Sequence, residues 1–383
     1  MEQSQSVDVS DEFLVVEGEQ THSNNAALTD LPTPLIFSAT TRQHTDLFKN
    51  YSGDIGLIMT VNGHKISTKA STQVLSLASP VWSQVIQNYA AGKFNFMKNN
   101  QELSNHEVGA RGGTSQHLDF TEDNTEALTV LLNIAHLDFG KVPRKELCFS
   151  KLLNLAKLVA KYKCLSLVEP FYKNWLEGED FEPFQDGHEN WLFIAYVFGR
   201  HAAFAKLTKK IAKEVRVNKD GSLIDSLGQL FKDPMPHGIL ESIQEVRETT
   251  IKNTLDIWYH YVDSLIDSQT ISCKLGKADC DELAFGKIVM ALKQLNLWPA
   301  KTEIDLSVND LADKLKGFSF GALGKGHEGC HEVSEIQRLT VEVAQGIPSP
   351  ILYSHYSAMT SACMTLNCGA KDQEYDNCED LDF

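Results

Sequence analysis

The sequence predicts an α+β protein in which a small sheet with paired helices is followed by a mainly α-helical region. Three observations support this: an alternating apolar segment that ends in Asn62-Gly63, a helical pattern broken by Ser79-Pro80, and helix-period stripes through most of the remaining chain. With 383 residues, of which 42% are hydrophobic and 22% charged, the chain has ordinary globular composition and is long enough for two or three domains.

The net charge of −16 is concentrated at the two ends of the chain. Residues 1–50 hold eight acidic and two basic side chains, and residues 369–383 hold six and one. Because both ends are polar and lack a sustained period, we expect disordered acidic tails over 1–44 and 363–383. Binding to nucleic acid is not expected, since it requires clustered Lys and Arg to neutralise phosphates.

The chain opens without a charged and then apolar leader, and no apolar run approaches the length of a membrane span. We therefore expect an intracellular protein, cytoplasmic or nuclear, that does not bind membranes. Its eight cysteines are expected to be thiols or metal ligands rather than a disulfide framework.

The first ordered elements are predicted from about residue 47. DIGLIMTVNGHKI (54–66) alternates apolar residues on one face, which predicts a strand, and Asn62-Gly63 is a strong hairpin signal. In VLSLASPVWSQVI (74–86), Ser79 is a favoured N-cap and Pro80 is tolerated at the first helical position. The Ser-Pro pair should therefore end one helix and start the next.

After the paired helices, the Asn- and Gly-rich residues 97–116 predict a long exposed loop, and HLDF (117–120) predicts a return to strand. Asp123 and Glu126 form a capping-box pattern at the start of a helix. A further helix is predicted around 155–162, and the Glu169-Pro170 step is expected to start another.

The rest of the chain has mostly helical periodicity. A stripe of Trp191, Ile194, Ala195 and Phe198 predicts one helix, and residues 239–266 predict a long one. These patterns divide the chain into the following expected parts: an acidic tail (1–44), a first domain (45–178), a helical region (179–268), a second helical region (269–362) and an acidic tail (363–383).

The order of these elements and four of their sequences resemble a BTB/POZ domain of the kind found in many fungal proteins. The matching pieces are GDIGLIMTVNGHKI, VLSLASPVWSQVI, LDFTEDNTEALTVLLNIAHLDFGKVP and LLNLAKLVAKYKCLSLVEPFYKNWL, which together cover about residues 47–178. NWLFIAYVFG and LNLWP resemble the helical region that follows in those proteins. The resemblance implies a BTB/POZ fold with Trp82 in its core.

The resemblance also implies a non-enzymatic adaptor or scaffold that binds a protein partner. In agreement, the sequence holds no G-x-S-x-G elbow or P-loop. BTB domains commonly dimerise through a helix before the hairpin, so a homodimer would rest on the short candidate at Leu47-Phe48. Asp54 is a further expected interaction residue. In the family it would face a base, for which Lys69 is the loose counterpart here.

Two alternative functions stay open. The first is a substrate-recognition subunit of a cullin-based ubiquitin ligase, whose adaptors often carry a hydrophobic-x-Glu motif after the paired helices. Here Phe94-Asn95-Phe96 has Phe where Glu is expected, which weakens a cullin partner without excluding it. The second is a transcriptional regulator, although the chain has no zinc-finger array and no basic groove-binding region.

One constellation of side chains has the pattern of a metal site. Cys273 and Cys280 are followed, after forty-six residues, by His327 and Cys330, giving C-x6-C and H-x2-C. Zinc takes four nitrogen or sulfur ligands in a tetrahedron, usually as two close pairs. Similar cysteine and H-x-x-C positions in the resembled fungal proteins also imply a structural Zn²⁺. His331 is the substitute ligand if His327 points away, and the alternative is free thiols and a surface histidine.

Overall fold

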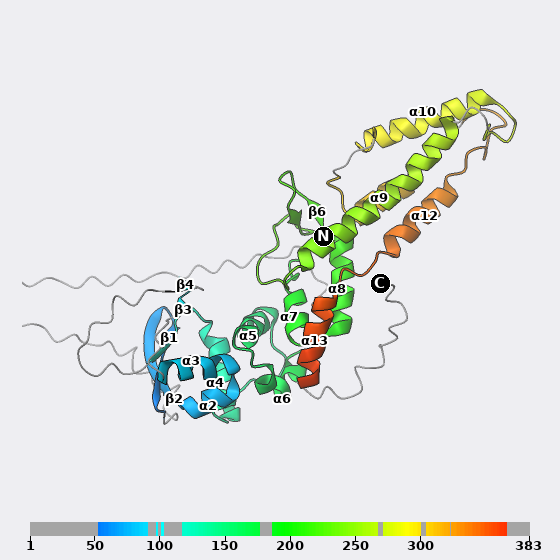
Figure 1. The fold of residues 1–383 in the computed structure, drawn as a ribbon. Coiled ribbons are helices and arrows are strands. Elements are labelled where there is room, and N and C mark those ends of the chain that lie inside the picture. The colour runs from blue at the N-terminus through cyan, green and yellow to red at the C-terminus, as the bar shows by residue number, and fades with distance from the viewer. Residues whose placement is uncertain are drawn as a thin grey trace, which may run out of the picture.

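The structure is a computed structural model that describes residues 53–90, 97–98, 101–102, 117–176, 186–266, 271–299, 304–321 and 323–365. It confirms the expected α+β class, with a small sheet at one end of the molecule and a long helical arm at the other (Figure 1). The predicted interaction residues Leu47, Phe48 and Phe94 lie outside the described residues.

The small sheet forms around the predicted hairpin. Strand β1 (Ile55–Val61) pairs antiparallel with β2 (His64–Ala70) and parallel with β5 (His117–Phe120), in the order β2-β1-β5. Asn62 and Gly63 have φ values of 49° and 79°, the left-handed conformations that a two-residue hairpin turn requires. The alternation of β1 buries Ile55, Leu57 and Met59, so the prediction from the pattern is confirmed.

The Ser79-Pro80 pair separates two helices as predicted, α2 (Thr72–Ala78) and α3 (Pro80–Ala90). The Ser79 hydroxyl accepts a hydrogen bond from the Trp82 backbone N–H at 3.0 Å and donates one to the Tyr162 carbonyl at 2.6 Å. Trp82 is 1% exposed and packs against Phe120 and Tyr162, which makes it a core residue.

Helix α4 (Thr125–Ala135) starts differently from the prediction, because its N-cap is Asn124 and not Asp123. The Asn124 side chain accepts the Ala127 N–H at 3.0 Å. The carboxylate of Asp123 instead accepts hydrogen bonds from the Tyr162 hydroxyl and the Lys161 ammonium group of the following helix. Contacts with Tyr162 and Lys161 thus hold the Asp123 side chain that the local sequence pattern predicted as the helix cap.

Most of the expected loop over 97–116 lies outside the described residues, and the described part forms a pair of two-residue strands, β3 (Met97–Lys98) and β4 (Gln101–Glu102). The prediction of a helix start at Glu169-Pro170 was wrong. Pro170 does not start a helix but lies inside α6 (Leu165–Trp175). The break comes earlier, because Lys163 adopts a left-handed φ of 49° and ends α5 (Phe149–Tyr162).

The second half of the described chain is mainly helical, and the predicted stripes at 191–198 and 239–266 are confirmed as helices. Two short strands, β6 (Arg216–Val217) and β7 (Leu223–Ile224), lie among these helices. The first half of the chain also contains a short 3₁₀ helix, η2 (Phe139–Lys141). The helices are α7 (Trp191–Val197), α8 (His201–Glu214), α9 (Ile239–Ile266), α10 (Ala278–Gln294), α11 (Val308–Lys316), α12 (Ser334–Gln345) and α13 (Tyr353–Thr365).

Helix α9 is the axis of the arm. It contacts α8 and α11, and helices α10 and α12 lie along it toward its outer end (Figure 1). Its buried Trp258 donates from Nε1 to the Thr340 hydroxyl of α12 at 2.8 Å. In the part of the chain that the structure describes, no helix combines the length and apolar character needed to cross a membrane.

The Ser79→Ala variant tests the junction of α2 and α3. We expect it to lower the free energy of unfolding by about 2 kcal/mol, because α3 loses its cap and the buried Tyr162 carbonyl loses its donor. Denaturant unfolding of the full chain measures this loss. Ser83→Ala on the same helix, whose hydroxyl accepts a hydrogen bond from the exposed Gln87 amide, is the control and should change stability by less than about 0.5 kcal/mol. Equal midpoints for both variants would contradict the role of Ser79.

Candidate metal centre

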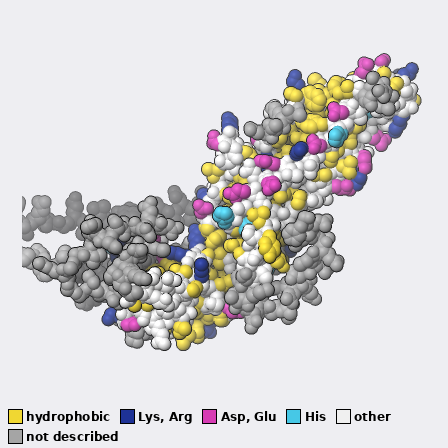
Figure 2. Space-filling model, viewed as in Figure 1, with side chains coloured by type: hydrophobic (Ala, Val, Ile, Leu, Met, Phe, Trp, Pro, Cys, Tyr) yellow, Lys and Arg dark blue, Asp and Glu magenta, His cyan; other side chains and the backbone are white. Residues whose placement is uncertain are grey.

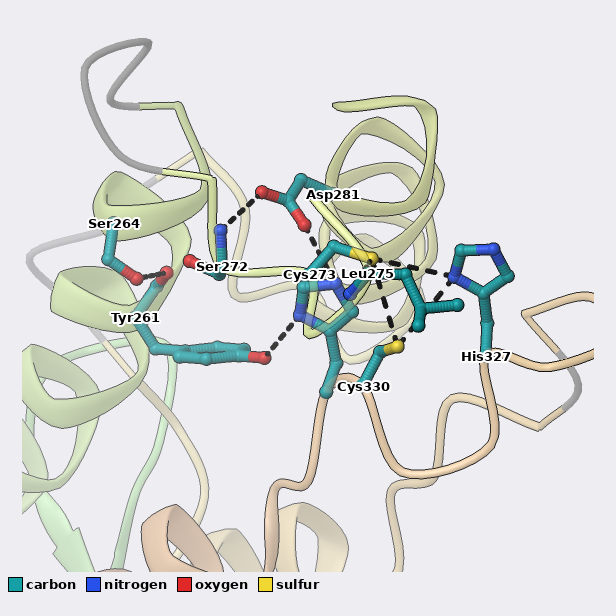
Figure 3. Close-up of polar contacts among 9 residues, drawn as sticks. Tyr261, Ser264, Ser272, Cys273, Leu275, Asp281, His327 and Cys330 are labelled. Atoms are coloured by element: carbon teal, nitrogen blue, oxygen red, sulfur yellow. Dashed lines mark hydrogen bonds and ion pairs between the residues drawn. The ribbon is translucent and has the colours of Figure 1, made fainter. Parts of the chain in front are cut away.

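The fold brings the four predicted metal ligands together at the outer end of the arm. Cys273 lies in the connection between α9 and α10, Cys280 in the first turn of α10, and His327 and Cys330 in the loop before α12. Figure 3 shows Cys273, His327 and Cys330 with their side chains directed toward one another. The C-x6-C and H-x2-C pairs, far apart in sequence, therefore belong to one cluster.

Local turns accompany the ligands of each pair. The Gly276 N–H donates to the Cys273 carbonyl at 2.9 Å, and the Cys280 N–H donates to the Lys277 carbonyl at 3.2 Å. The Cys330 N–H donates to the His327 carbonyl at 3.2 Å, so one turn contains both members of the H-x2-C pair. Gly329 in this turn has a φ of 75°, a conformation that residues with a Cβ rarely adopt.

The distances within the cluster fit a tetrahedral zinc site. Cys273 Sγ lies 3.8 Å from Cys330 Sγ and 3.5 Å from His327 Nδ1, and Cys330 Sγ lies 3.7 Å from the same nitrogen. Bonds of about 2.3 Å to sulfur and about 2.05 Å to nitrogen would set these separations at about 3.8 Å and about 3.6 Å. The ligand atom of Cys280 completes the set, and all four lie within 4.8 Å of one another. The cluster could hold a metal ion.

The cluster is buried but poor in apolar contacts. Cys273, Cys280 and Cys330 are at most 8% exposed and form a small group of their own. Among the described residues this group packs against the half-buried Leu323, which also contacts the main hydrophobic core. Three thiols and one leucine bury too little apolar area to order two loops by hydrophobic contact alone. A bound ion would add the missing stabilisation.

The electrostatics of the metal-free cluster favour one thiolate. Burial opposes ionisation of Cys273, but hydrogen bonds from the backbone N–H groups of Lys277 and Leu275 outweigh it and lower the pKa of Cys273 to about 7. Burial, together with the hydrogen bond and negative charge of Cys273, raises the pKa of Cys280 to about 12. Near neutral pH, Cys273 is therefore largely available as a thiolate that can bind a cation, whereas Cys280 loses its proton only when a cation binds.

His331, the predicted substitute ligand, is not part of this set of four. It is buried, with Nε2 3.0 Å from Asp281 Oδ1 and Nδ1 3.4 Å from the Tyr261 hydroxyl. Figure 3 shows Tyr261 and Asp281 beside the cysteine cluster. The sequence analysis missed Tyr261 and Asp281, because neither has a spacing that marks a ligand. The one signal in the sequence was that Asp281 follows Cys280 directly, as His331 follows Cys330.

Asp54, the predicted interaction residue at the start of the first strand, has a local partner. Its carboxylate accepts hydrogen bonds from the hydroxyl and backbone N–H of Thr72 at 2.6 and 2.7 Å, which lower its pKa. Asp54 thus ties the start of β1 to the start of α2, and its role toward a partner stays a prediction.

No protein-family model matches this chain, and no curated protein is significantly similar to it. The resemblance to BTB/POZ domains accordingly stays a prediction.

Metal affinity should depend on pH in a way set by Cys273. Below its pKa of about 7, the metal-free protein carries a proton on this thiol that zinc must displace. The logarithm of the apparent affinity should therefore fall more steeply with decreasing pH below about 7 than above it, by about one additional proton per ion. Competition with a chelator between about pH 6 and about pH 8.5 measures the slope.

The Cys273→Ser variant is the comparison for this titration. It should bind zinc more weakly and lose the change of slope near neutral pH. An affinity that does not vary with pH in the unaltered chain would contradict thiolate ligation.

Proposed function

We propose that this chain is a non-enzymatic interaction protein with a BTB/POZ-type adaptor module and a helical arm whose outer end is fixed by a structural Zn²⁺. The observation that carries the proposal is the convergence of four ligand atoms: those of Cys273, His327 and Cys330 lie at separations expected for tetrahedral zinc, and that of Cys280 lies within 4.8 Å of them. The module would bind a protein partner, and the ion would hold the arm in one shape.

The ligand set supports a structural rather than a catalytic ion. Four protein ligands fill the coordination sphere of zinc and leave no position for substrate or water. Three of these ligands are buried cysteines. Because the ligands come from two segments, the binding free energy becomes folding free energy for residues 271–280 and 323–333.

The order of elements around the sheet supports the adaptor module. A hairpin, two helices, a strand parallel to the first and further helices follow one another, as in the resembled family. The surface of this region also exposes large apolar side chains, of which Leu77 at 84% and Leu137 at 73% are the most exposed. Exposed leucines of this kind are available to a protein partner.

Removing two ligands tests the zinc site. The Cys273→Ser/Cys330→Ser variant should bind at least one zinc ion fewer per chain, measured by elemental analysis after purification without chelator. Backbone amides of 271–280 and 323–333 should exchange hydrogen at least about tenfold faster, because the clip between the two segments is lost.

Two comparisons make this experiment specific. Cys148→Ser removes an exposed cysteine outside the cluster and should leave zinc content and exchange unchanged. Hydrogen exchange in the β1–β2 hairpin should also stay unchanged in the double variant. This result would show that the variant loses the metal link between the two segments without unfolding globally. Full zinc content in the double variant would refute the site.

Substitution of an exposed leucine tests the adaptor module. Leu77→Asp should leave the unfolding midpoint unchanged, since the side chain is 84% exposed, but should weaken capture of the native partner by at least about tenfold. The measurement is quantitative affinity capture with the full chain from its own host.

Leu230→Asp is the matched control, because Leu230 is 56% exposed and lies outside residues 53–176. It should capture the partner as the unaltered chain does. Equal capture by the Leu77 and Leu230 variants would count against a partner bound to this face of the module.

A further inference from the structure

A second group of donor atoms lies beside the four-ligand cluster. Ligand atoms of Cys280, Asp281 and His331 lie within 4.8 Å of one another, and all three residues are buried. Cys280 belongs to both groups. Two sets of metal-binding atoms therefore share one sulfur at the outer end of the arm.

Two atoms of this second group are left without a hydrogen bond. Asp281 Oδ1 and His331 Nε2 are 3.0 Å apart, an ion-pair distance, but their geometry is not that of a hydrogen bond and neither has another partner among the described residues. Both residues are 7% exposed. Leaving a carboxylate oxygen and an imidazole nitrogen buried without hydrogen bonds is costly, and a cation bound beside both atoms would remove this cost.

The opposite atom of each side chain is held in place. Asp281 Oδ2 accepts the Ser272 N–H at 2.7 Å, and His331 Nδ1 lies 3.4 Å from the Tyr261 hydroxyl. Metal-binding histidines and carboxylates are typically oriented by such hydrogen bonds on the atom that does not bind the ion. The unpaired atoms are thus the ones that a metal would use. Figure 3 shows these contacts of Ser272, Tyr261 and Asp281.

We propose that Cys280, Asp281 and His331 bind a second divalent ion of the zinc type, with the Cys280 thiolate bridging the two ions. The proposal rests on the proposed zinc site, with which it shares Cys280. Sulfur, nitrogen and carboxylate oxygen together suit Zn²⁺ or Co²⁺. Three protein ligands leave one coordination position for a small ligand such as water.

Charge balance supports two ions over one. Three thiolates and the Asp281 carboxylate bring four negative charges into a region where Asp281 and the three cysteines are buried. One divalent ion neutralises half of this charge, and a second neutralises the rest. The competing arrangement is a protonated His331 paired with Asp281, which would leave no room for the second ion.

The metal content of the full chain decides between a second bound ion and an ion pair of His331 with Asp281. Metal-stripped protein is reloaded with Zn²⁺, desalted and measured by native mass spectrometry. We expect two zinc ions per chain in the unaltered protein, one in His331→Gln and one in Asp281→Asn. Asp279→Asn, on the same helix but exposed, should keep two. Titration with Co²⁺ provides a second measurement, because the electron-spin signal of the first equivalent should diminish when a thiolate-bridged second ion enters.

The outcomes separate the two proposals. One zinc per chain in all four proteins, with a cobalt signal that never diminishes, overturns the second site and leaves the four-ligand site intact. No bound zinc in the unaltered chain overturns both. If a variant fails to fold, the cobalt titration of the unaltered chain still decides whether a second ion binds next to the first.

Discussion

The packing of helices around α9 is the constraint on which the second half of the described chain depends. Helix α9 (Ile239–Ile266) has 28 residues and so extends for about 42 Å. Its outer part is covered by α10 and α12, which are far apart in the sequence. Both helices also contribute to the main core, for example through Ile288 of α10 and Ile336 of α12, and Thr340 of α12 accepts a hydrogen bond from Trp258. The Cys/His cluster adds a further connection at the tip, between the start of α10 and the loop before α12.

The inner end of α9 is fixed by a different kind of interaction. Arg247 is 2% exposed and donates to the carbonyls of Val215, Ile304 and Leu306 at 3.2, 2.6 and 2.7 Å. Burial lowers the pKa of Arg247, yet a guanidinium stays protonated, and the three carbonyls supply the acceptors that its charge requires. A buried arginine thus joins α9 to the connections that follow α8 and precede α11. Hydrogen bonds of Arg247 therefore fix the base of the arm, and the Cys/His cluster lies at its tip.

The sequence was most informative where one residue type decides the local conformation. The hairpin turn predicted at Asn62-Gly63 and the helix boundary predicted at Ser79-Pro80 were both correct. A left-handed turn favours Asn and Gly, and a helix start favours Ser followed by Pro. Local rules failed where a distant side chain competed. Asp123 and Asn124 can both cap a helix, and only the position of Tyr162 decided between them. The four-ligand site followed from spacing, but the contacts of Asp281, His331 and Tyr261 depend on how α9 lies against the loop before α12, which no local pattern contains.

The separation of the cysteine cluster from the main core has a consequence for the proposed function. The main core runs from Ile55 in β1 to Met359 in α13 and contains none of the three clustered cysteines. The main core includes residues of the arm, such as Trp258 of α9, Ile288 of α10 and Ile336 of α12, and it is packed without the cluster. A bound ion would therefore order the two loops at the tip of the arm and leave the helices and the sheet as they are. In the proposed adaptor, metal binding would then change the surface at the tip, while the exposed face around Leu77 stays the same.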